Sequence, residues 1–167
     1  MGTGDRQPSF ADGLTLRPAR DEDHGFALAL YLESTKPLLI ALRRWDEEQL
    51  LARFAQGFKL EQIRVLSSAG TDIGWMQVSE TVEELHLDQL HLVDHARNHG
   101  IGTHLIQALK NQATASDRAV ALNVIRGNRA QQLYERLGFR VVGGDEERVR
   151  MLWQQDRTDT EIDGRPR

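Results

Sequence analysis

The chain of 167 residues contains no cysteine, which excludes thiol nucleophiles, thiolate metal ligands and disulfide bonds. It has no apolar run long enough to cross a membrane, and its N-terminus lacks the basic-then-apolar layout of a signal peptide. Positive charge is not in excess either, because the formal net charge is −4. We therefore expect a cytoplasmic protein that has neither nucleic acid nor a membrane as a partner.

The length suits a single domain with one sizeable core. The polar residues 1–13 are expected to form a flexible leader, and the charged residues 154–167 a flexible tail. The domain would then cover residues 14–153. Strand and helix patterns alternate along it, which predicts the α/β class.

Hydrophobic periodicity and turn residues define the expected elements. The predicted strands cover residues 14–16, 63–66, 73–79, 85–92, 119–124, 139–142 and 149–153. The predicted helices cover residues 22–33, 46–57, 101–115 and 128–138. Lys36-Pro37 is expected to break the chain after the first helix. Asp46 and Asn128, each with a glutamine three residues on, predict capping boxes for the second and fourth helices.

The strand at 85–92 carries an irregular pattern. Leu85 and Leu87 alternate in one phase, whereas Leu90 and Leu92 alternate in the other. A strand that keeps one face buried can shift phase in this way only through a β-bulge, here at Asp88-Gln89. Such a bulge leaves a backbone N–H free to bond something other than a neighbouring strand.

A glycine-containing loop, 97–102, follows this strand and opens an amphipathic helix. Its sequence is Arg97-Asn98-His99-Gly100-Ile101-Gly102. Backbone N–H groups at a helix N-terminus form a seat for an anion, and glycine lets the backbone approach a phosphate closely. A dinucleotide-binding fingerprint is the less favoured alternative, because the third glycine and the acidic residue are missing. A simple chain reversal is the other alternative.

Five of the six histidines fall between His86 and His104. His91, His95 and His99 are spaced by four, as metal ligands on one helix face would be. Gly100 would break such a helix, and no glutamate lies between His95 and His99, so the zinc-protease motif is absent. We expect no bound metal, and interpret the histidines as a weakly basic rim around the anion seat.

Three further side chains are candidates for acid–base chemistry. Tyr134 lies on the fourth helix, where it could be a core aromatic or an acid for a departing thiolate. Glu80 at a strand end and Glu33 at the end of the first helix could each serve as a base or as an anchor for an ammonium group. A solvated surface role is the simpler alternative for both carboxylates.

Two motifs together resemble the GNAT superfamily of acyl-CoA-dependent N-acyltransferases. The first runs from Leu90-His91-Leu92 to Arg97-x-x-Gly100-x-Gly102, and the second is Asn128-x-x-Ala-x-x-Leu-Tyr134-Glu-x-Leu-Gly138-Phe139. The resemblance covers residues 14–153. It implies a GNAT-like fold with a central, mostly antiparallel, splayed sheet flanked by helices, and acetyl-CoA as the cofactor.

The resemblance also implies roles for individual residues. Leu90, His91 and Leu92 would pair with pantetheine, with the bulge N–H polarising the thioester carbonyl. Asn128 would contact the pantetheine arm, Asn123 would contact the cofactor or the acceptor, and Tyr134 would protonate the leaving thiolate. The pyrophosphate would be held by the loop and the first turn of the helix: Arg97, Asn98, His99, Gly100, Ile101, Gly102 and Thr103.

The sequence departs from the family at Asn98 and His99, where glycine and then a basic residue are usual. Asparagine tolerates unusual backbone angles, so the loop can keep its shape. His99 is a weaker cation, so we expect cofactor affinity to fall as the pH rises through its titration.

The predicted function is therefore the transfer of an acetyl group from acetyl-CoA directly to a primary amine of a small molecule or a peptide. Without cysteine, a covalent acyl-enzyme on sulfur is excluded, although serine is not. The protein would act as a monomer or a homodimer. The alternatives are a non-catalytic acyl-CoA sensor on the same fold and a metal-binding module.

Overall fold

The computed structural model describes residues 13–156 as one seven-stranded sheet with the order β1-β2-β3-β4-β5-β7-β6. Neighbouring strands are antiparallel except β4 and β5, which are parallel. The strands are β1 (Leu14–Pro18), β2 (Ile63–Ser68), β3 (Thr71–Glu80), β4 (Glu84–Leu92), β5 (Ala119–Ile125), β6 (Arg140–Gly144) and β7 (Arg148–Trp153). The α-helices are α1 (His24–Ala41), α2 (Glu47–Gly57), α3 (Ile101–Ala115) and α4 (Ala130–Arg136). Short 3₁₀ turns cover Asp21–Asp23, Leu60–Gln62 and Asp94–Ala96. This mixed, mostly antiparallel sheet flanked by helices confirms the predicted fold class.

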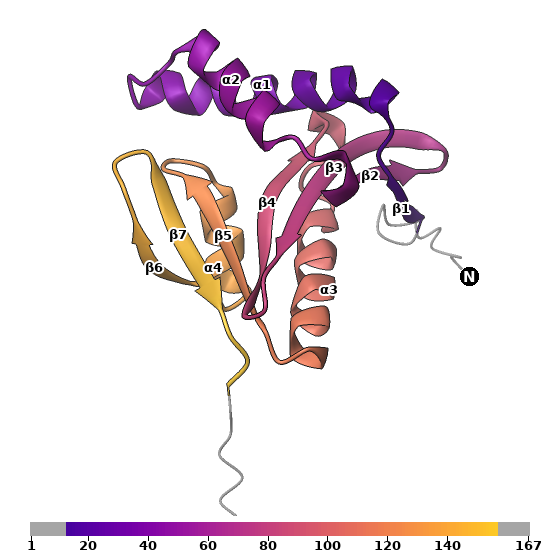
Figure 1. Cartoon of the computed structure of the whole chain (residues 1–167), viewed down its shortest axis with the longest axis vertical. Helices are drawn as coiled ribbons and strands as arrows, with labels where there is room; N and C mark the ends of the chain where they lie inside the picture. The colour runs from indigo at the N-terminus through magenta and orange to yellow at the C-terminus, as the bar shows by residue number, and fades with distance from the viewer. Residues whose placement is uncertain (1–12, 157–167) are drawn as a thin grey trace, which may run out of the picture.

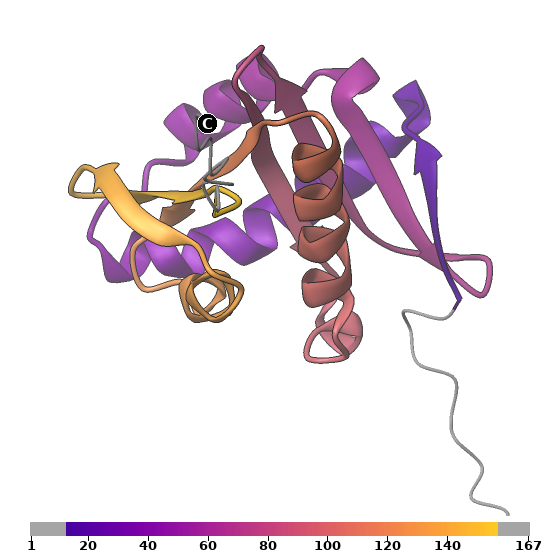
Figure 2. The ribbon, with the colours of Figure 1, turned by 90° about the horizontal axis from the view of Figure 1, so that it is seen from below.

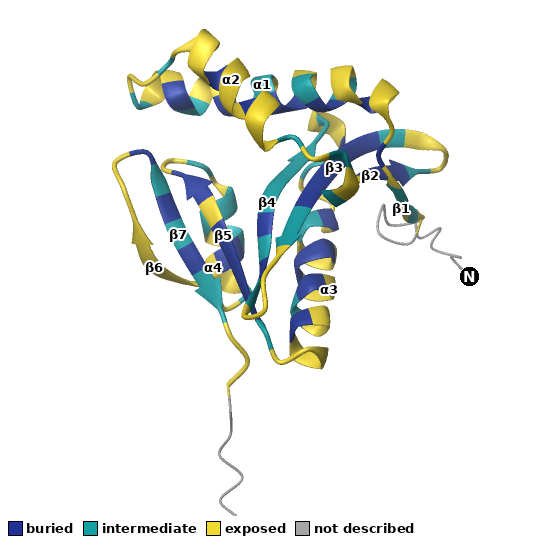
Figure 3. Ribbon diagram, in the orientation of Figure 1, coloured by how far each residue is buried: buried dark blue, intermediate teal, exposed yellow. Residues whose placement is uncertain are grey.

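The helices cover opposite faces of the sheet (Figures 1 and 2). Helices α1 and α2 lie across one end of the first face, whereas α3 and α4 pack on the other face. Alternating strand residues feed the two cores: Val65 and Trp75 pack with α1 and α2, whereas Leu66 and Met76 pack with α3. Figure 3 shows buried residues along the central strands β3, β4 and β5 and on the helices α1 and α3.

Helix α1 is longer than the sequence predicts. It continues through Pro37 to Ala41, so the expected break at Lys36-Pro37 is wrong. Proline removes one intrahelical hydrogen bond, to the carbonyl of Glu33, at a cost of about 3 kcal/mol. Leu39, 2% exposed, is buried against the sheet beyond the proline, and Leu42 packs beside it. This apolar burial offsets the helix defect, and no local pattern could have revealed it.

Neither predicted capping box has its reciprocal side-chain bond among the hydrogen bonds of residues 13–156. Asp46 caps α2, because its Oδ1 accepts the N–H of Gln49 at 3.0 Å. Asn128 Oδ1 accepts the N–H of Ala130 at 2.9 Å, whereas the Gln131 side chain bonds Glu135. The reciprocal bond of a second capping box is therefore replaced by an Asx-type turn before α4.

The central irregularity is the one that the sequence predicts. The β3–β4 register shifts between Gln77–Gln89 and Val78–Leu87, which leaves Asp88 as the extra, bulged residue. Across the sheet, β4 pairs with β5 only from Glu84–Ala119 to Leu87–Leu122, and the two strands then separate. Within residues 13–156, none of the helices has both the length and the apolar character that a membrane span requires.

Candidate active site

The site is built around the split between β4 and β5. Leu87 and Leu122 form the last pair, so the stretch of β4 from Asp88 to Leu92 keeps β3 as a neighbour but has no strand from residues 13–156 on its β5 side. We call this stretch, 88–92, the open arm. The open arm presents backbone N–H and C=O groups that an extended ligand can bond as an added strand. It leads directly to the loop before α3.

The loop 97–102 has the geometry of an anion seat. Asn98 adopts a left-handed conformation with φ +62°, as does Gly100 with φ +79°. Gly100 is the N-cap of α3 and has no side chain to bond the first N–H groups of the helix. The expectation that asparagine can hold this turn is confirmed by the backbone angle. The positive end of the α3 dipole is therefore left available to an anion.

Neighbouring side chains fix this loop in place. Ile101 is 1% exposed and anchors the first turn of α3 in the core. The half-buried Arg97 donates from Nε to the carbonyl oxygen of Leu92 at 3.1 Å and lies 3.7 Å from Asp94. The Arg97 guanidinium thus ties the loop to the end of the open arm, next to the α3 N-terminus. Thr103 is exposed on the first turn of α3.

Helix α4 lies close to the start of α3 because Gly102 has no side chain. A Cβ at Gly102 would lie 3.1 Å from Cδ2 of Leu133. Tyr134, the next residue, is buried in the same core cluster as Leu87, Leu122 and Val124, the residues that flank the split. The Tyr134 ring also packs on Phe139, with 5.8 Å between the ring centroids. Tyr134 therefore approaches the split from the face that carries α3 and α4.

Burial raises the pKa of the Tyr134 hydroxyl to about 12. The phenol therefore stays protonated throughout the physiological range and can act as a hydrogen-bond donor. It is also a weaker acid than a solvated tyrosine. Both readings of this residue from the sequence, as core aromatic and as candidate acid, fit its position.

The three residues expected to line the cofactor alternate along the open arm. Leu90 and Leu92 pack against the α3 core. His91 points to the other face, where Nδ1 lies 2.7 Å from Ser34 Oγ on α1 and Nε2 lies 2.7 Å from Gln89 Oε1. Burial, together with the charge of Arg97, lowers the pKa of His91 to about 4. His91 is thus neutral at physiological pH, and its side chain links α1 to the open arm by a hydrogen bond.

The other predicted site residues are not all brought to the split. Asn123 is exposed on β5, one residue beyond the last pair with β4, and Asn128 lies in the turn before α4. Glu80 lies near the β3–β4 turn, where it pairs with Leu85 in the ladder and its Oε2 bonds Arg118 at 2.8 Å. Glu33 is exposed near the middle of α1, beside the residue that bonds His91. The structure therefore places Asn123 at the split, Glu33 near the open arm, and Glu80 away from both.

The histidines spaced by four do not share one element. His91 is on β4, His95 is in the turn Asp94–Ala96 and His99 is in the loop before α3. Among residues 13–156, no three histidine or carboxylate side chains are grouped so that they could hold a metal ion. The spacing that suggested a metal site belongs to a strand, a turn and a loop.

Sequence reasoning did not single out His86 and Asp88, which form a hydrogen-bonded pair at the split. Nδ1 of His86 lies 2.8 Å from Oδ1 of Asp88, and Nε2 lies 3.3 Å from Nδ2 of Asn123. The available signal was their position: they flank Leu87, immediately before the phase slip of the strand.

Comparisons with known proteins agree with this geometry. The family model described as "Acetyltransferase (GNAT) domain" matches residues 42–155. No relative was found among curated protein sequences.

Three solved structures illustrate the similarity of fold. The PaiA N-acetyltransferase of Thermoplasma acidophilum, in complex with coenzyme A, is 20% identical with a TM-score of 0.66, covering 84% of this chain and 98% of its own. The spermidine N-acetyltransferase of Vibrio cholerae, in complex with CoA and spermine, is 21% identical with a TM-score of 0.58, covering 86% and 96%. A GNAT-family acetyltransferase of Listeria monocytogenes is 15% identical with a TM-score of 0.60, covering 84% and 94%. The family match extends over more than half of the chain and includes the split strands, the loop and α4, so the chain belongs to the GNAT acetyltransferase family.

Proposed function

We propose that this protein transfers the acetyl group of acetyl-CoA directly to a primary amine of a small molecule or a peptide. The observation that carries the proposal is the split between β4 and β5, which opens immediately before the uncapped N-terminus of α3. The open arm offers an unpaired strand edge, and the N-terminus of α3 offers an anion seat. These two sites are adjacent, as pantetheine and the pyrophosphate are in coenzyme A.

The residues at the α3 N-terminus suit the pyrophosphate. The backbone N–H groups of Ile101, Gly102 and Thr103 belong to the first helical turn, where no intrahelical acceptor exists for them. Arg97 adds a fixed positive charge, and Asn98 and His99 complete the loop. We assign this group of residues to the pyrophosphate.

The open arm suits pantetheine. Leu90, His91 and Leu92 have no strand neighbour on the β5 side within the described part of the chain, and Asn123 of β5 lies one residue beyond the last pair with β4. We assign Asn128, in the turn before α4, to the pantetheine arm as well. The bulge at Asp88 also breaks the ladder to β3 locally, which leaves an N–H that can polarise the thioester carbonyl. An oxyanion donor of this kind is typically worth about 3 kcal/mol of activation free energy.

Acetyl-CoA supplies an activated acyl group, and the protein supplies positioning and proton transfer. Tyr134 lies beside the split in a buried environment that keeps its hydroxyl protonated. We propose that the Tyr134 hydroxyl donates to the departing sulfur. Because burial weakens the phenol as an acid, its contribution is a hydrogen bond as much as a completed proton transfer.

A thermal-shift titration tests cofactor binding first. Acetyl-CoA and CoA are expected to raise the melting temperature, and NADH is not. At a hundred times its Kd a ligand adds about 2.7 kcal/mol of stability, which is readily measured. No shift with either CoA species would refute the proposed cofactor site.

An acetyl-transfer assay then tests catalysis on a panel of primary amines. The panel includes polyamines, since the Vibrio cholerae structure contains spermine, as well as amino acids and short peptides. Release of CoA that depends on the amine is expected, and Tyr134→Phe is expected to lower kcat about 10-fold or more while leaving the Kd of acetyl-CoA nearly unchanged. Binding without transfer to any amine would favour the alternative of a non-catalytic acyl-CoA sensor.

A further inference from the structure

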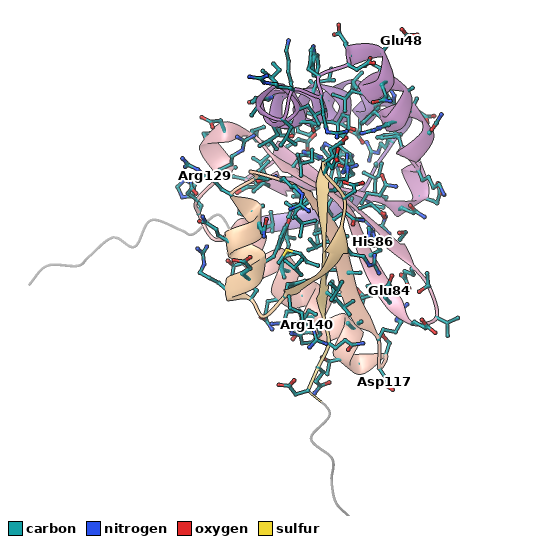
Figure 4. The ribbon with its side chains drawn as sticks, turned by 90° about the vertical axis from the view of Figure 1, so that its left-hand side faces the viewer. Glu48, Glu84, His86, Asp117, Arg129 and Arg140 are labelled. Atoms are coloured by element: carbon teal, nitrogen blue, oxygen red, sulfur yellow. The ribbon has the colours of Figure 1, made fainter. Side chains whose placement is uncertain are left out.

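A connected group of polar side chains lies across the vertex of the split, on the face of the sheet opposite Tyr134. We call it the vertex triad: His86 and Asp88 of β4, and Asn123 of β5. Its bonds run from Asp88 Oδ1 to His86 Nδ1 at 2.8 Å and from His86 Nε2 to Asn123 Nδ2 at 3.3 Å. Figure 4 shows His86, with Glu84, on the side of the sheet away from α4.

The hydrogen-bond partners define the form of the neutral imidazole. An ionised carboxylate can only accept, so Nδ1 of His86 must carry the proton that is donated to Asp88. The lone pair of a neutral His86 is then on Nε2, where the Asn123 amide donates to it across a long 3.3 Å contact. Asn123 is exposed and can rotate away when a ligand enters. His86 therefore presents a hydrogen-bond acceptor to the gap between the strands.

Asp88 is suited to stabilise a charged imidazole. Burial alone would raise the pKa of Asp88, but hydrogen bonds from His86 and Ser79 outweigh it and hold that pKa below its usual value. The carboxylate is therefore ionised at neutral pH, and it accepts the hydrogen bond from Nδ1 of the ring that it contacts. An orienting carboxylate behind an imidazole is the arrangement that makes histidine an effective proton acceptor.

The location of the triad matches the reaction centre. His86 pairs with Ala121, one step before the last pair Leu87–Leu122, and Asp88 is the bulged residue. Successive strand residues are about 3.3 Å apart and point to opposite faces. Leu87 faces the core that holds Tyr134, so His86 faces the other side. A thioester in the split would thus have Tyr134 on one side and His86 on the other.

We propose that His86, oriented by Asp88, is the base that accepts a proton from the ammonium group of the acceptor. This inference rests on the proposed function. The free amine then forms a bond to the acetyl carbon while the bond from that carbon to sulfur breaks. Tyr134 gives its proton to the departing sulfur, and the second proton of the nitrogen replaces it on Tyr134. His86 passes the first proton to solvent, so that one proton is released per turnover.

The other charged groups near His86 are already committed. On the same face of β4, Glu84 accepts two bonds from Arg150 of β7, at 3.0 and 3.1 Å, so the two charges neutralise each other. On β3, Glu80 is held by Arg118. His91 lies further along β4, where it contacts α1, and its two ring nitrogens are hydrogen-bonded to Ser34 and Gln89. Nε2 of His86 is therefore the basic nitrogen that faces the gap at the vertex.

The experiment compares acceptors that differ in basicity. Alkylamines are protonated at neutral pH and need a base, whereas a hydrazide is already neutral. His86→Gln is expected to slow transfer to an alkylamine about 100-fold or more, the usual contribution of a general base. Transfer of acetyl to the hydrazide should be slowed far less. The Kd of acetyl-CoA, measured by calorimetry, should stay within about threefold of the wild-type value.

Two further variants separate catalysis from a structural role. Asp88→Asn keeps the shape of the side chain but removes the charged acceptor that orients the His86 ring, so it should slow transfer to the alkylamine more than transfer to the hydrazide. His24→Gln is the matched control, because His24 is an exposed histidine at the start of α1, outside the loop 97–102 and the split. It should keep the wild-type rates with both acceptors. A triad that only pinned β4 to β5 would slow both acceptors equally.

Each outcome decides between the two proposals. Loss of alkylamine transfer with retained hydrazide transfer supports His86 as the base. Equal rates for wild type and His86→Gln, or equal losses with both acceptors, would overturn that role while leaving the acetyltransferase function intact. A wild-type protein that binds acetyl-CoA but acetylates no amine would overturn both proposals.

Discussion

Replacing Gly74 with alanine should destabilise the packing of the open arm on β3. Gly74 of β3 pairs with Leu92 at the end of the open arm. A Cβ at this position would collide with the backbone carbonyl oxygen of His91 and would lie 2.8 Å from Cδ2 of Leu92. The leucine can rotate away, but a backbone carbonyl in a strand cannot, so β3 and β4 must separate locally.

The magnitude follows from these contacts. Overpacking a close interface typically costs about 1–3 kcal/mol. Separation would also weaken the bond from the Val93 N–H to the Ile73 carbonyl, 2.8 Å long, at a cost of about 1 kcal/mol. We expect a loss of about 3 kcal/mol in the free energy of unfolding. For a chain of this size that corresponds to a fall of about 6–12 °C in Tm.

Thermal and urea denaturation measure this loss, and Gly57→Ala is the control. Gly57 ends α2, and a Cβ there meets nothing within 4 Å. Removing a helical glycine in open space should leave the protein unchanged or stabilise it by up to about 1 kcal/mol. A Gly74→Ala protein that melts within about 2 °C of the control would refute the claim that the open arm is packed this tightly on β3.

Two further predictions concern the α3–α4 contact and the N-terminal part of the chain. Gly102→Val should lower the free energy of unfolding by about 2 kcal/mol and weaken acetyl-CoA binding, because the valine side chain meets Leu133. The double variant with Leu133→Ala should lose less stability than the sum of the two single variants. Denaturation measures the stabilities in this double-mutant cycle, and calorimetry measures acetyl-CoA binding. Asp23→Asn should cost about 2 kcal/mol at pH 7, because two bonds from Arg17, each 2.8 Å, hold the pKa of the buried Asp23 below its usual value. A carboxylate with a lowered pKa stabilises the fold above its unfolded pKa of about 4 and ceases to do so as the pH falls through its folded pKa. The urea stability of the variant and of the wild type should therefore converge at low pH, and a constant difference from pH 7 to pH 2 would contradict the role of this ion pair.

Much of the site could be predicted because it depends on local sequence. The phase slip between Leu87 and Leu90 located the bulge, since a buried strand face admits no other explanation. The loop could be located because Asn98 and Gly100 suit positive φ and an amphipathic helix follows them. These features each depend on residues within about one turn or one strand of each other.

Other features depend on contacts between distant segments. The path of α1 through Pro37 is decided by burial of Leu39 against strands far along the chain. The vertex triad needs the parallel register that pairs Leu87 with Leu122 and so brings Asn123 beside His86. No periodicity in either strand encodes that register. From the sequence alone, His86 is therefore expected to be one of a group of rim histidines, and a carboxylate is expected to be the base.

The same irregularities that reveal the site also explain how a ligand would act on stability. The bulge at Asp88, the unpaired side of the open arm and the uncapped start of α3 each leave backbone groups without the partners that a regular sheet or a capped helix supplies. A ligand that adds a strand and an anion would satisfy these groups only in the folded protein. Its binding energy would therefore be added to the free energy of unfolding. The stabilisation should be largest for the open arm and the first turn of α3, so amide hydrogen exchange in residues 88–103 should slow most when acetyl-CoA binds. Protection spread evenly over the sheet would instead show that the ligand is bound elsewhere.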